Sequence, residues 1–387
     1  MINVAEAAQL IKSHLPTFKS EKIAIDKSIG LLSSLSIYAP LSLPPFVQSS
    51  VDGYAIRFHD LDNSDVLSLA DEVAAGCSKT SLLKQGSAIR IYTGAPVPFG
   101  ADTIVMQEFA RQNPRGISFD PKPEKKGTHV REVGSHIKKG ELVLLKGECI
   151  TVAMVGHLSG LGISEVEVIQ RPSVAIVTTG SEVMEPGTPL SDGKIYDSNK
   201  AALSAALKEH GISPVSVTHV FDNPEQILAE IEKGLETCDL LIITGGVSVG
   251  EYDYVIPMLE KAGVTKIFHG VKQKPGKPLF FGKKGSKLVF GLPGNPVSTL
   301  ACFHLYISSV VQNKSPLLLQ LPLANHFHKK AGLTHFLRGF ANGHQVEILS
   351  GQDSYMLHTF TKANCLVSIP EAVETVNKGE LVDVRIF

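Results

Sequence analysis

Several features are missing from this sequence of 387 residues, and each absence excludes a class of protein. The five cysteines are an odd number, are widely spaced and form no Cys-x-x-Cys pair, which argues against a disulfide framework and a zinc knuckle. No apolar run approaches the ~20 residues of a membrane-spanning helix, and residues 1–16 lack the basic and apolar regions of a signal peptide. We therefore expect a cytoplasmic protein with reduced thiols and no membrane partner.

An excess of charge is missing as well. The chain has 37 basic and 38 acidic residues, so a non-specific nucleic-acid partner is not indicated. Neither GxxxxGK[ST] nor GxGxxG occurs, which disfavours a P-loop NTPase and a Rossmann dehydrogenase. Hydrophobic residues make up 43 % of the chain and charged residues 19 %, a globular composition for two to four domains.

Residues 173–313 alternate between short apolar segments and amphipathic segments. This alternation predicts a doubly wound α/β domain with a mostly parallel sheet covered by helices on both faces. The expected strands are 174–178, 215–221, 240–244, 266–269 and 288–290, and the expected helices are 199–210, one from 224, 254–262, and one from 296.

The rest of the chain has short β-like segments and many turns. Asn342-Gly343 divides two such segments, which is a strong hairpin signal. We therefore predict a multidomain α/β and β protein, in which small β-rich domains flank the α/β domain. The predicted domains are a β-rich domain at 44–127, the α/β domain at 170–318, a C-terminal β domain at 319–387, and a discontinuous linker or dimerisation domain at 1–43 plus 128–169. In the last of these, a helix at 152–160 would pack on the N-terminal helix.

Unusual residues follow one expected strand after another. Because parallel strands end at one edge of a sheet, where ligands of such folds bind, we expect these residues to lie together. Glycine-rich turns and a helix start can offer backbone amides to an anion, lysines add charge, and carboxylates suit Mg²⁺ beside a phosphate. The candidate anion-binding residues are Gly245, Gly246, Ser248, Gly250, Gly294, Asn295 and Ser298; the lysines are Lys274 and Lys277; the candidate metal ligands are Glu182, Asp222 and Asp253.

Each residue alone has a structural alternative. The glycines could simply form tight turns, and Asp222 or Asn295 could cap the helix that follows. A second set of candidates, around Asp52 and Thr93, could likewise belong to plain hairpin turns. That set lies far along the chain from 244–298 and joins the site only if domains or subunits bring the two together.

The combined stretches resemble the molybdopterin molybdenumtransferase (MoeA) family, which is related to the E domain of gephyrin. The stretches are SSVDGYAIR, RIYTGAPVPFGADTIVMQE, TTGSE, IYDSN, TGGVSVGEYDY, KPGKP and GLPGNPVS, in the order that the family has them. The resemblance covers essentially the whole chain.

The resemblance implies an elongated homodimer that inserts molybdate into adenylylated molybdopterin, requires Mg²⁺ and releases AMP. It implies a cleft between the α/β domain of one subunit and the second domain of the other, and an adenylyltransferase of the same pathway as a partner. The residues that it carries over are Glu182, Asp222, Asp253, Lys274, Lys277, Pro293, Pro296 and Ser298 from the α/β domain, with Asp52 and Thr93 from the β domain. Asp253 and Glu182 would position Mg²⁺, the lysines would hold molybdate or phosphate, and Asp52 and Thr93 would order the far side of the cleft.

Three positions depart from the family pattern. Asn223 and Ser181 replace acidic residues, and His136 stands near another acidic position, so the metal ligands could differ. One alternative function is a gephyrin-type scaffold or partner-binding protein with the same fold. Another is a pterin- or nucleotide-binding hydrolase that shares only the α/β domain. Retention of the cleft residues disfavours the scaffold, and the matching β regions disfavour the hydrolase.

Overall fold

The computed structural model describes residues 1–77, 81–248, 250, 253–312 and 317–387, so three residues of the TGGVSVGEYDY stretch lie outside the described part. The chain divides into two compact units. Met1–Lys19 and Gln170–Phe387 form the first unit, and Ser20–Ile169 forms the second. Among the described residues, we find no helix with the length and apolar character that a bilayer crossing requires.

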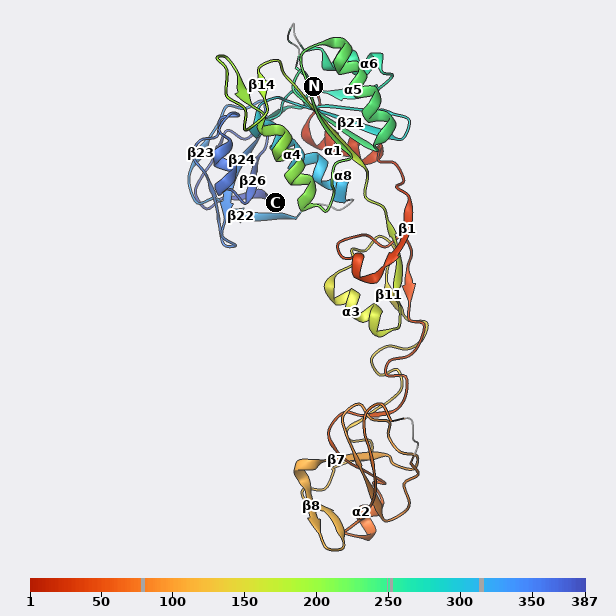
Figure 1. Cartoon of the computed structure of the whole chain (residues 1–387). Helices are drawn as coiled ribbons and strands as arrows, with labels where there is room; N and C mark the ends of the chain where they lie inside the picture. The colour runs from red at the N-terminus through yellow and green to blue at the C-terminus, as the bar shows by residue number, and fades with distance from the viewer. Residues whose placement is uncertain (78–80, 249, 251–252, 313–316) are drawn as a thin grey trace. The chain divides into compact units, whose positions relative to one another are not determined.

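A six-stranded sheet forms the centre of the first unit (Figure 1). Its strands lie in the order β16 (Ser216–Val220), β13 (Val174–Thr179), β17 (Leu240–Thr244), β21 (Lys287–Leu292), β20 (Phe280–Lys284) and β18 (Thr265–His269). The first four are mutually parallel, which confirms the predicted sheet, whereas β20 is antiparallel to both neighbours. β20 was not predicted, because alternation implies a helix between successive strands, whereas β20 joins β21 by a tight hairpin.

Helices cover both faces of this sheet, as the alternation predicted. α1 (Val4–Ser13), α4 (Ser198–Glu209) and α7 (Pro296–Cys302) contribute to one core, and α5 (Pro224–Thr237) and α6 (Val255–Lys261) contribute to the other. In α5, Ile227, Ile231 and Leu235 are all buried, and each such side chain contributes about 2 kcal/mol. α7 continues into a π-helical turn, η3 (Phe303–Ile307), and then into α8 (Ser308–Gln312).

The N-terminal helix packs differently from the prediction. Asn3 and Glu6 form a capping box that starts α1, and Ala7 and Ile11 are buried in the α/β core. The expected partner helix, α3 (Val152–Gly160), lies in the second unit. The prediction had α1 in the discontinuous domain, whereas α1 belongs to the α/β core. An apolar helical face shows that a helix packs but not which surface receives it.

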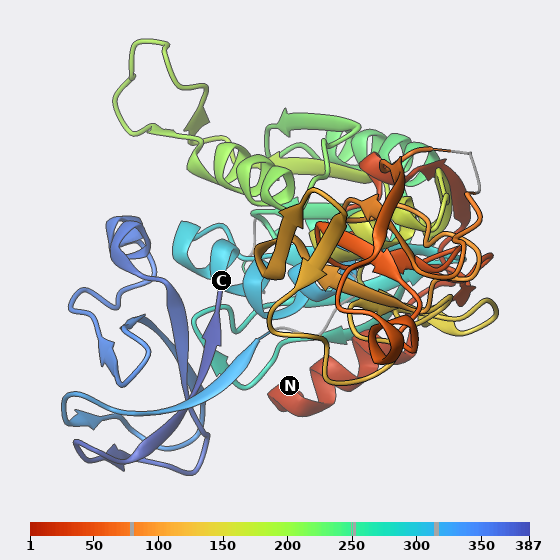
Figure 2. The same ribbon diagram turned by 90° about the horizontal axis from the view of Figure 1, so that it is seen from below.

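A second sheet completes the first unit, and its C-terminal strands are blue in Figure 2. Its order is β19 (Gln273–Lys274), β24 (Thr334–Ala341), β26 (Cys365–Ile369), β28 (Leu381–Ile386) and β22 (Leu318–Pro322). β25 (Val346–Ile348) pairs with β24, which confirms the predicted hairpin. β19 belongs to this sheet although the α/β domain surrounds it in sequence, so it ties the C-terminal β region to the 274–278 segment.

The second unit contains separate groups of buried side chains. One part is a four-stranded sheet in the order β5 (Ser68–Val73), β6 (Ser87–Ile91), β4 (Gly53–Ile56) and β7 (Thr103–Met106). The other part surrounds α3 and includes two strand pairs, β1 (Ser20–Ala24) with β12 (Glu165–Ile169) and β2 (Ile37–Tyr38) with β11 (Leu142–Leu144).

Candidate functional site

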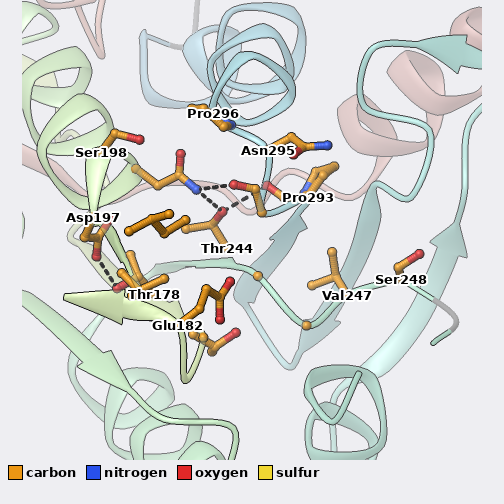
Figure 3. A pocket seen from close by; sticks show the side chains of 18 of the residues that line it. Thr178, Glu182, Asp197, Ser198, Thr244, Val247, Ser248, Pro293, Asn295 and Pro296 are labelled. Atoms are coloured by element: carbon orange, nitrogen blue, oxygen red, sulfur yellow. Dashed lines mark hydrogen bonds between the residues drawn. The ribbon is translucent and has the colours of Figure 1, made fainter. Parts of the chain in front are cut away.

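A cavity of about 660 Å³ lies where the parallel strands of the α/β sheet end (Figure 3). The register pairs Thr178 with Thr244, and Thr244 with Leu292, so β13, β17 and β21 end almost level with one another. The loops that leave these ends form the cavity walls. The predicted site residues among its lining are Glu182, Asp222, Gly245, Gly246, Ser248, Asp253, Pro293, Gly294, Asn295 and Pro296.

The glycine turn after β17 fits its neighbours closely. Gly245 has φ +95°, and a Cβ added there would lie 2.4 Å from the main-chain oxygen of Thr179. The N–H of Gly245 donates to Leu292 O at 3.1 Å, and the N–H of Gly250 donates to Asp253 Oδ2 at 2.6 Å. The N–H groups of these two glycines therefore already have acceptors within the protein. Of the anion donors predicted in this turn, Gly246 and Ser248 remain.

The turn before α7 is held from several sides. Asn199 Nδ2 donates to Gly294 O at 2.7 Å, and Thr244 Oγ1 donates to Pro293 O at 3.0 Å. Asn295 occupies the N-cap position but makes no capping bond; its Nδ2 donates to Ser354 Oγ at 3.1 Å. The capping alternative for Asn295 was therefore wrong.

Ser298, predicted as a donor to the ligand, is only 4 % exposed and is not part of the cavity lining. It lies in the first turn of α7, where its position in the helix directs it into the packed interior. The sequence showed that Ser298 follows the helix start, but it did not show which side of the helix the cavity occupies.

Three predicted metal ligands line the cavity, each in a different local setting. Asp222 Oδ2 accepts the N–H of Ser181 at 2.7 Å, and Ser181 Oγ accepts the N–H of Asp222 at 3.1 Å. Asp253 accepts the amide of Gly250 through Oδ2. Glu182 follows β13 in the chain and is among the labelled lining residues (Figure 3). Within the described ranges, no three His, Cys, Asp or Glu side chains form a ready-made metal cluster.

Two positions that depart from the family pattern have structural roles here. Ser181 exchanges hydrogen bonds with Asp222, as described above. Asn223 caps α5, because its side chain accepts the N–H groups of Glu225 and Gln226 at 3.0 Å each. The cap of this helix is thus Asn223 and not Asp222, so the carboxylate of Asp222 is left on the cavity side.

The predicted lysines are not among the residues that line this cavity. Lys274 and Lys277 are both exposed, and Lys277 directly precedes Pro278, which lines the 660 Å³ cavity. Lys274 instead lines a second cavity of about 450 Å³ together with His335 and Lys329. This offset arises because β18, the strand before the lysines, is separated from β21 by β20.

Asp52 and Thr93 meet within the second unit. Asp52 Oδ1 accepts both the N–H and the Oγ1–H of Thr93, each at 2.8 Å. These hydrogen bonds, first the one from the backbone amide, hold the pKa of the Asp52 carboxyl below its ordinary value because they stabilise the charged form. The two residues, 41 positions apart in sequence, therefore form one polar group.

Several residues of the cavity are not among the predicted site residues. Asp197, 6 % exposed, accepts Thr178 Oγ1–H at 2.7 Å and caps α4 by accepting the N–H of Lys200 at 2.8 Å. Thr178 Oγ1 also lies 3.1 Å from His219 Nδ1. The run Asp197-Ser198-Asn199 before a helix is a capping signal that could have indicated this position. Tyr355 comes from the C-terminal β region, and no local pattern marks it as a cavity residue.

The fold and the cavity define the class of protein. The segment that carries the cavity, residues 175–313, matches a family model described as a probable molybdopterin binding domain. Residues 2–162 match the MoeA N-terminal region (domain I and II), and residues 320–387 match the MoeA C-terminal region (domain IV). The chain is thus a multidomain protein of the MoeA type.

The chain is similar to known proteins over its full length. The molybdopterin molybdenumtransferase of Haemophilus influenzae is 32 % identical, covering 100 % of this chain and 99 % of its own, and molybdopterin molybdenumtransferase 2 of Mycobacterium tuberculosis is 31 % identical over 99 % of each. Two crystal structures of the molybdopterin biosynthesis MoeA protein from Pyrococcus horikoshii superpose with TM-scores of 0.84 and 0.86. They are 30 % and 27 % identical to this chain, cover all of it, and are themselves covered to 99 % and 100 %. The chain belongs to the molybdopterin molybdenumtransferase family of molybdenum cofactor biosynthesis.

Proposed function

We propose that this protein inserts molybdate into adenylylated molybdopterin and releases AMP. The observation that carries the proposal is the convergence of Glu182, Asp222 and Asp253 on one cavity at the carboxyl edge of the sheet. Carboxylates alone would repel the phosphates of a phosphoanhydride ligand. Their presence in such a site therefore fits a divalent cation that binds between the carboxylates and the phosphates. The membership of the family supports the same reaction.

The side chains present fit a magnesium ion. Mg²⁺ keeps several waters and usually takes one or two carboxylates plus phosphate oxygens, so a cage of three protein ligands is not required. Glu182 and Asp253 would hold the ion or its waters, and Asp222, already bonded to Ser181, would act from further away. Bound there, Mg²⁺ would neutralise charge on the phosphoanhydride.

The chain's own residues supply positioning and charge. Gly246 and Ser248 would orient phosphate oxygens through their backbone amides. Lys274 and Lys277 would hold molybdate beside the cavity and offset negative charge as AMP leaves. As the two dithiolene sulfurs bind molybdenum, a molybdate oxygen leaves as water with the two thiol protons. A water molecule cleaves the phosphoanhydride, so AMP leaves and the pterin phosphate stays on the product. No covalent intermediate with the protein is needed.

The test is AMP release from adenylylated molybdopterin, measured with and without molybdate and with Mg²⁺ added or chelated. Activity that needs neither molybdate nor Mg²⁺ would contradict the proposal. Asp253→Asn should lower the rate at least about 100-fold, because the Asn oxygen can still accept the Gly250 amide while the charge is lost. Asp239→Asn is the matched control, since Asp239 also accepts a backbone amide, that of Ser173, but precedes β17. Equal losses of rate in both variants would contradict the assignment of Asp253 as a metal ligand.

We further propose that the working unit is a homodimer in the cytoplasm, supplied by an adenylyltransferase of the same pathway. Asp52 and Thr93 belong to the unit that lacks the cavity, so a second chain could contribute them. That unit also exposes apolar side chains, among them the cross-strand partners Tyr38 and Leu142, which are 58 % and 45 % exposed. Sedimentation tests the dimer. Mixing inactive Asp52→Ala and Asp253→Ala chains tests the shared site, and no recovery of activity would count against it.

A further inference from the structure

The 275–278 loop, which follows Lys274 and includes Lys277, lies against three buried side chains that the proposed reaction does not use. Gln273 and Cys302 are 0 % exposed, and Tyr306 is 2 % exposed. Gln273 comes from β19, and the other two come from the helical stretch that starts at the cavity.

The Gln273 side chain bonds directly to the backbone of this loop. Its Nε2 donates to Pro275 O at 3.0 Å and to Gly276 O at 3.4 Å. Its Oε1 accepts the hydroxyl hydrogen of Tyr306. Both ends of the amide therefore have partners, as a buried amide requires.

The loop carbonyls determine which way this amide faces, because they can only accept and so require the NH₂ group. A flipped amide would bring Oε1 against two carbonyl oxygens, and these buried atoms have no access to water that could compensate. Oε1 therefore faces the Tyr306 hydroxyl, which supplies its donor. Without that hydroxyl, Oε1 would be buried with no donor, so Tyr306 stabilises the orientation in which Gln273 holds the loop.

Tyr306 lies in the π-helical turn η3, a rare conformation that often occurs near functional sites. Arg385 of β28 stabilises this turn, because its Nη1 donates to His304 O and Leu305 O at 2.8 Å each. The C-terminal β region thus contacts both elements that hold the loop: β24 pairs with β19, which carries Gln273, and Arg385 bonds to the turn that carries Tyr306.

The loop also has no room to shift onto these side chains. Gly276 has φ +86°, and a Cβ added there would lie 2.4 Å from Cys302 Sγ and 2.8 Å from Gln273 Nε2. The loop backbone therefore lies in direct contact with the buried residues below it.

We propose that Gln273 and Tyr306 are positioning residues that set the conformation of the 275–278 loop and thereby the placement of Lys274 and Lys277. Only the link from these lysines to molybdate rests on the proposed function; the control of the loop conformation does not.

The first experiment measures deuterium uptake of the peptide covering residues 271–280 in the full-length protein. Tyr306→Phe removes one oxygen atom and Gln273→Met removes the amide at similar size, so both should raise uptake at Gly276, on the order of tenfold in rate. Ser28→Ala is the control, because Ser28 is a buried hydroxyl that donates to Ile25 O in the other unit. Unchanged uptake in both loop variants overturns the proposal.

The second experiment is the AMP-release assay at varied molybdate. The KM for molybdate should rise about tenfold in Tyr306→Phe, while the KM for the adenylylated substrate changes less than about twofold, since the loss falls on the lysines. The double variant should be no worse than the more defective single variant, because both act through one contact. Equal changes in both KM values, or additive losses, overturn the proposal.

Two further outcomes also decide the question. If the wild-type protein releases no AMP, the proposed function fails and the exchange experiment alone decides the role of Gln273 and Tyr306. If neither variant folds, the proposal is overturned, because it assigns these side chains to the loop and not to the stability of the core.

Discussion

Gly245→Ala should destabilise the α/β unit far more than Gly294→Ala, although both glycines line the same cavity. At Gly245 the backbone has φ +95°, and the new Cβ would lie 2.4 Å from Thr179 O and 2.6 Å from Thr179 Oγ1. At Gly294 the nearest atom is the Cα of Gly245 at 3.7 Å, an ordinary contact. The two substitutions add the same methyl group, so only the local geometry differs.

The expected cost at Gly245 has two parts. The left-handed backbone conformation costs a non-glycine residue about 1–3 kcal/mol, and displacing a buried strand to relieve the contact costs about 1–3 kcal/mol more. The total is about 2–6 kcal/mol, a large part of the stability of an ordinary domain. At Gly294 the change should stay within about 1 kcal/mol, because no strain is added and the unfolded chain loses some freedom.

Chemical denaturation by urea, followed by far-UV circular dichroism, gives the free energy of unfolding. Because a chain with two units need not unfold in one step, hydrogen exchange of the β17 peptide should be measured alongside to report on the α/β unit itself. A cost below about 1 kcal/mol at Gly245, or equal costs at the two positions, would refute the argument from close backbone approach.

Three further outcomes follow from the same structure. Thr93→Val should raise the pKa of Asp52 toward its ordinary value without restoring it fully, because the backbone amide still donates; an NMR titration of the full chain measures this, and an unchanged pKa would contradict the hydroxyl's part. Thr178→Val should cost about 1–3 kcal/mol in urea denaturation, since the buried Asp197 carboxylate loses a donor; a neutral effect would contradict it. Burial lowers the pKa of His304 to about 4, so the unfolded chain binds a proton that the folded chain does not; stability should therefore fall as pH drops from about 6.5 to about 4, by up to about 3 kcal/mol, and His304→Gln should flatten that slope.

The elements of the α/β domain could be predicted from sequence because their signals are local. The four-residue spacing of Ile227, Ile231 and Leu235 identifies a helix wherever the chain places it. The apolar run 240–244 became β17 within the same bounds. β20 was not predicted, because it forms a hairpin with β21 and no helix separates these two buried strands in the sequence.

The candidate site was predicted in part. That Glu182, Asp222, Gly245 and Gly294 gather at one edge follows from strand order and direction, which alternation predicts. Strand order and direction do not show which backbone amides remain available to a ligand. The amide of Gly245, for example, already donates to Leu292 across the sheet. The contribution of Tyr355 could not be predicted either, since its loop comes from another part of the chain.

The sequence by itself determined the family, the alternation of strands and helices, and the residue types that follow each strand. These depend on periodicity and short motifs, which are properties of neighbouring residues. Only the tertiary structure decided that Ser298 is buried, that α1 packs on the α/β sheet, and that Gln273 and Tyr306 lie beneath the 275–278 loop. Those facts depend on contacts between residues far apart in sequence, and a local pattern does not specify the partner of a buried side chain or a hydrogen-bonding group.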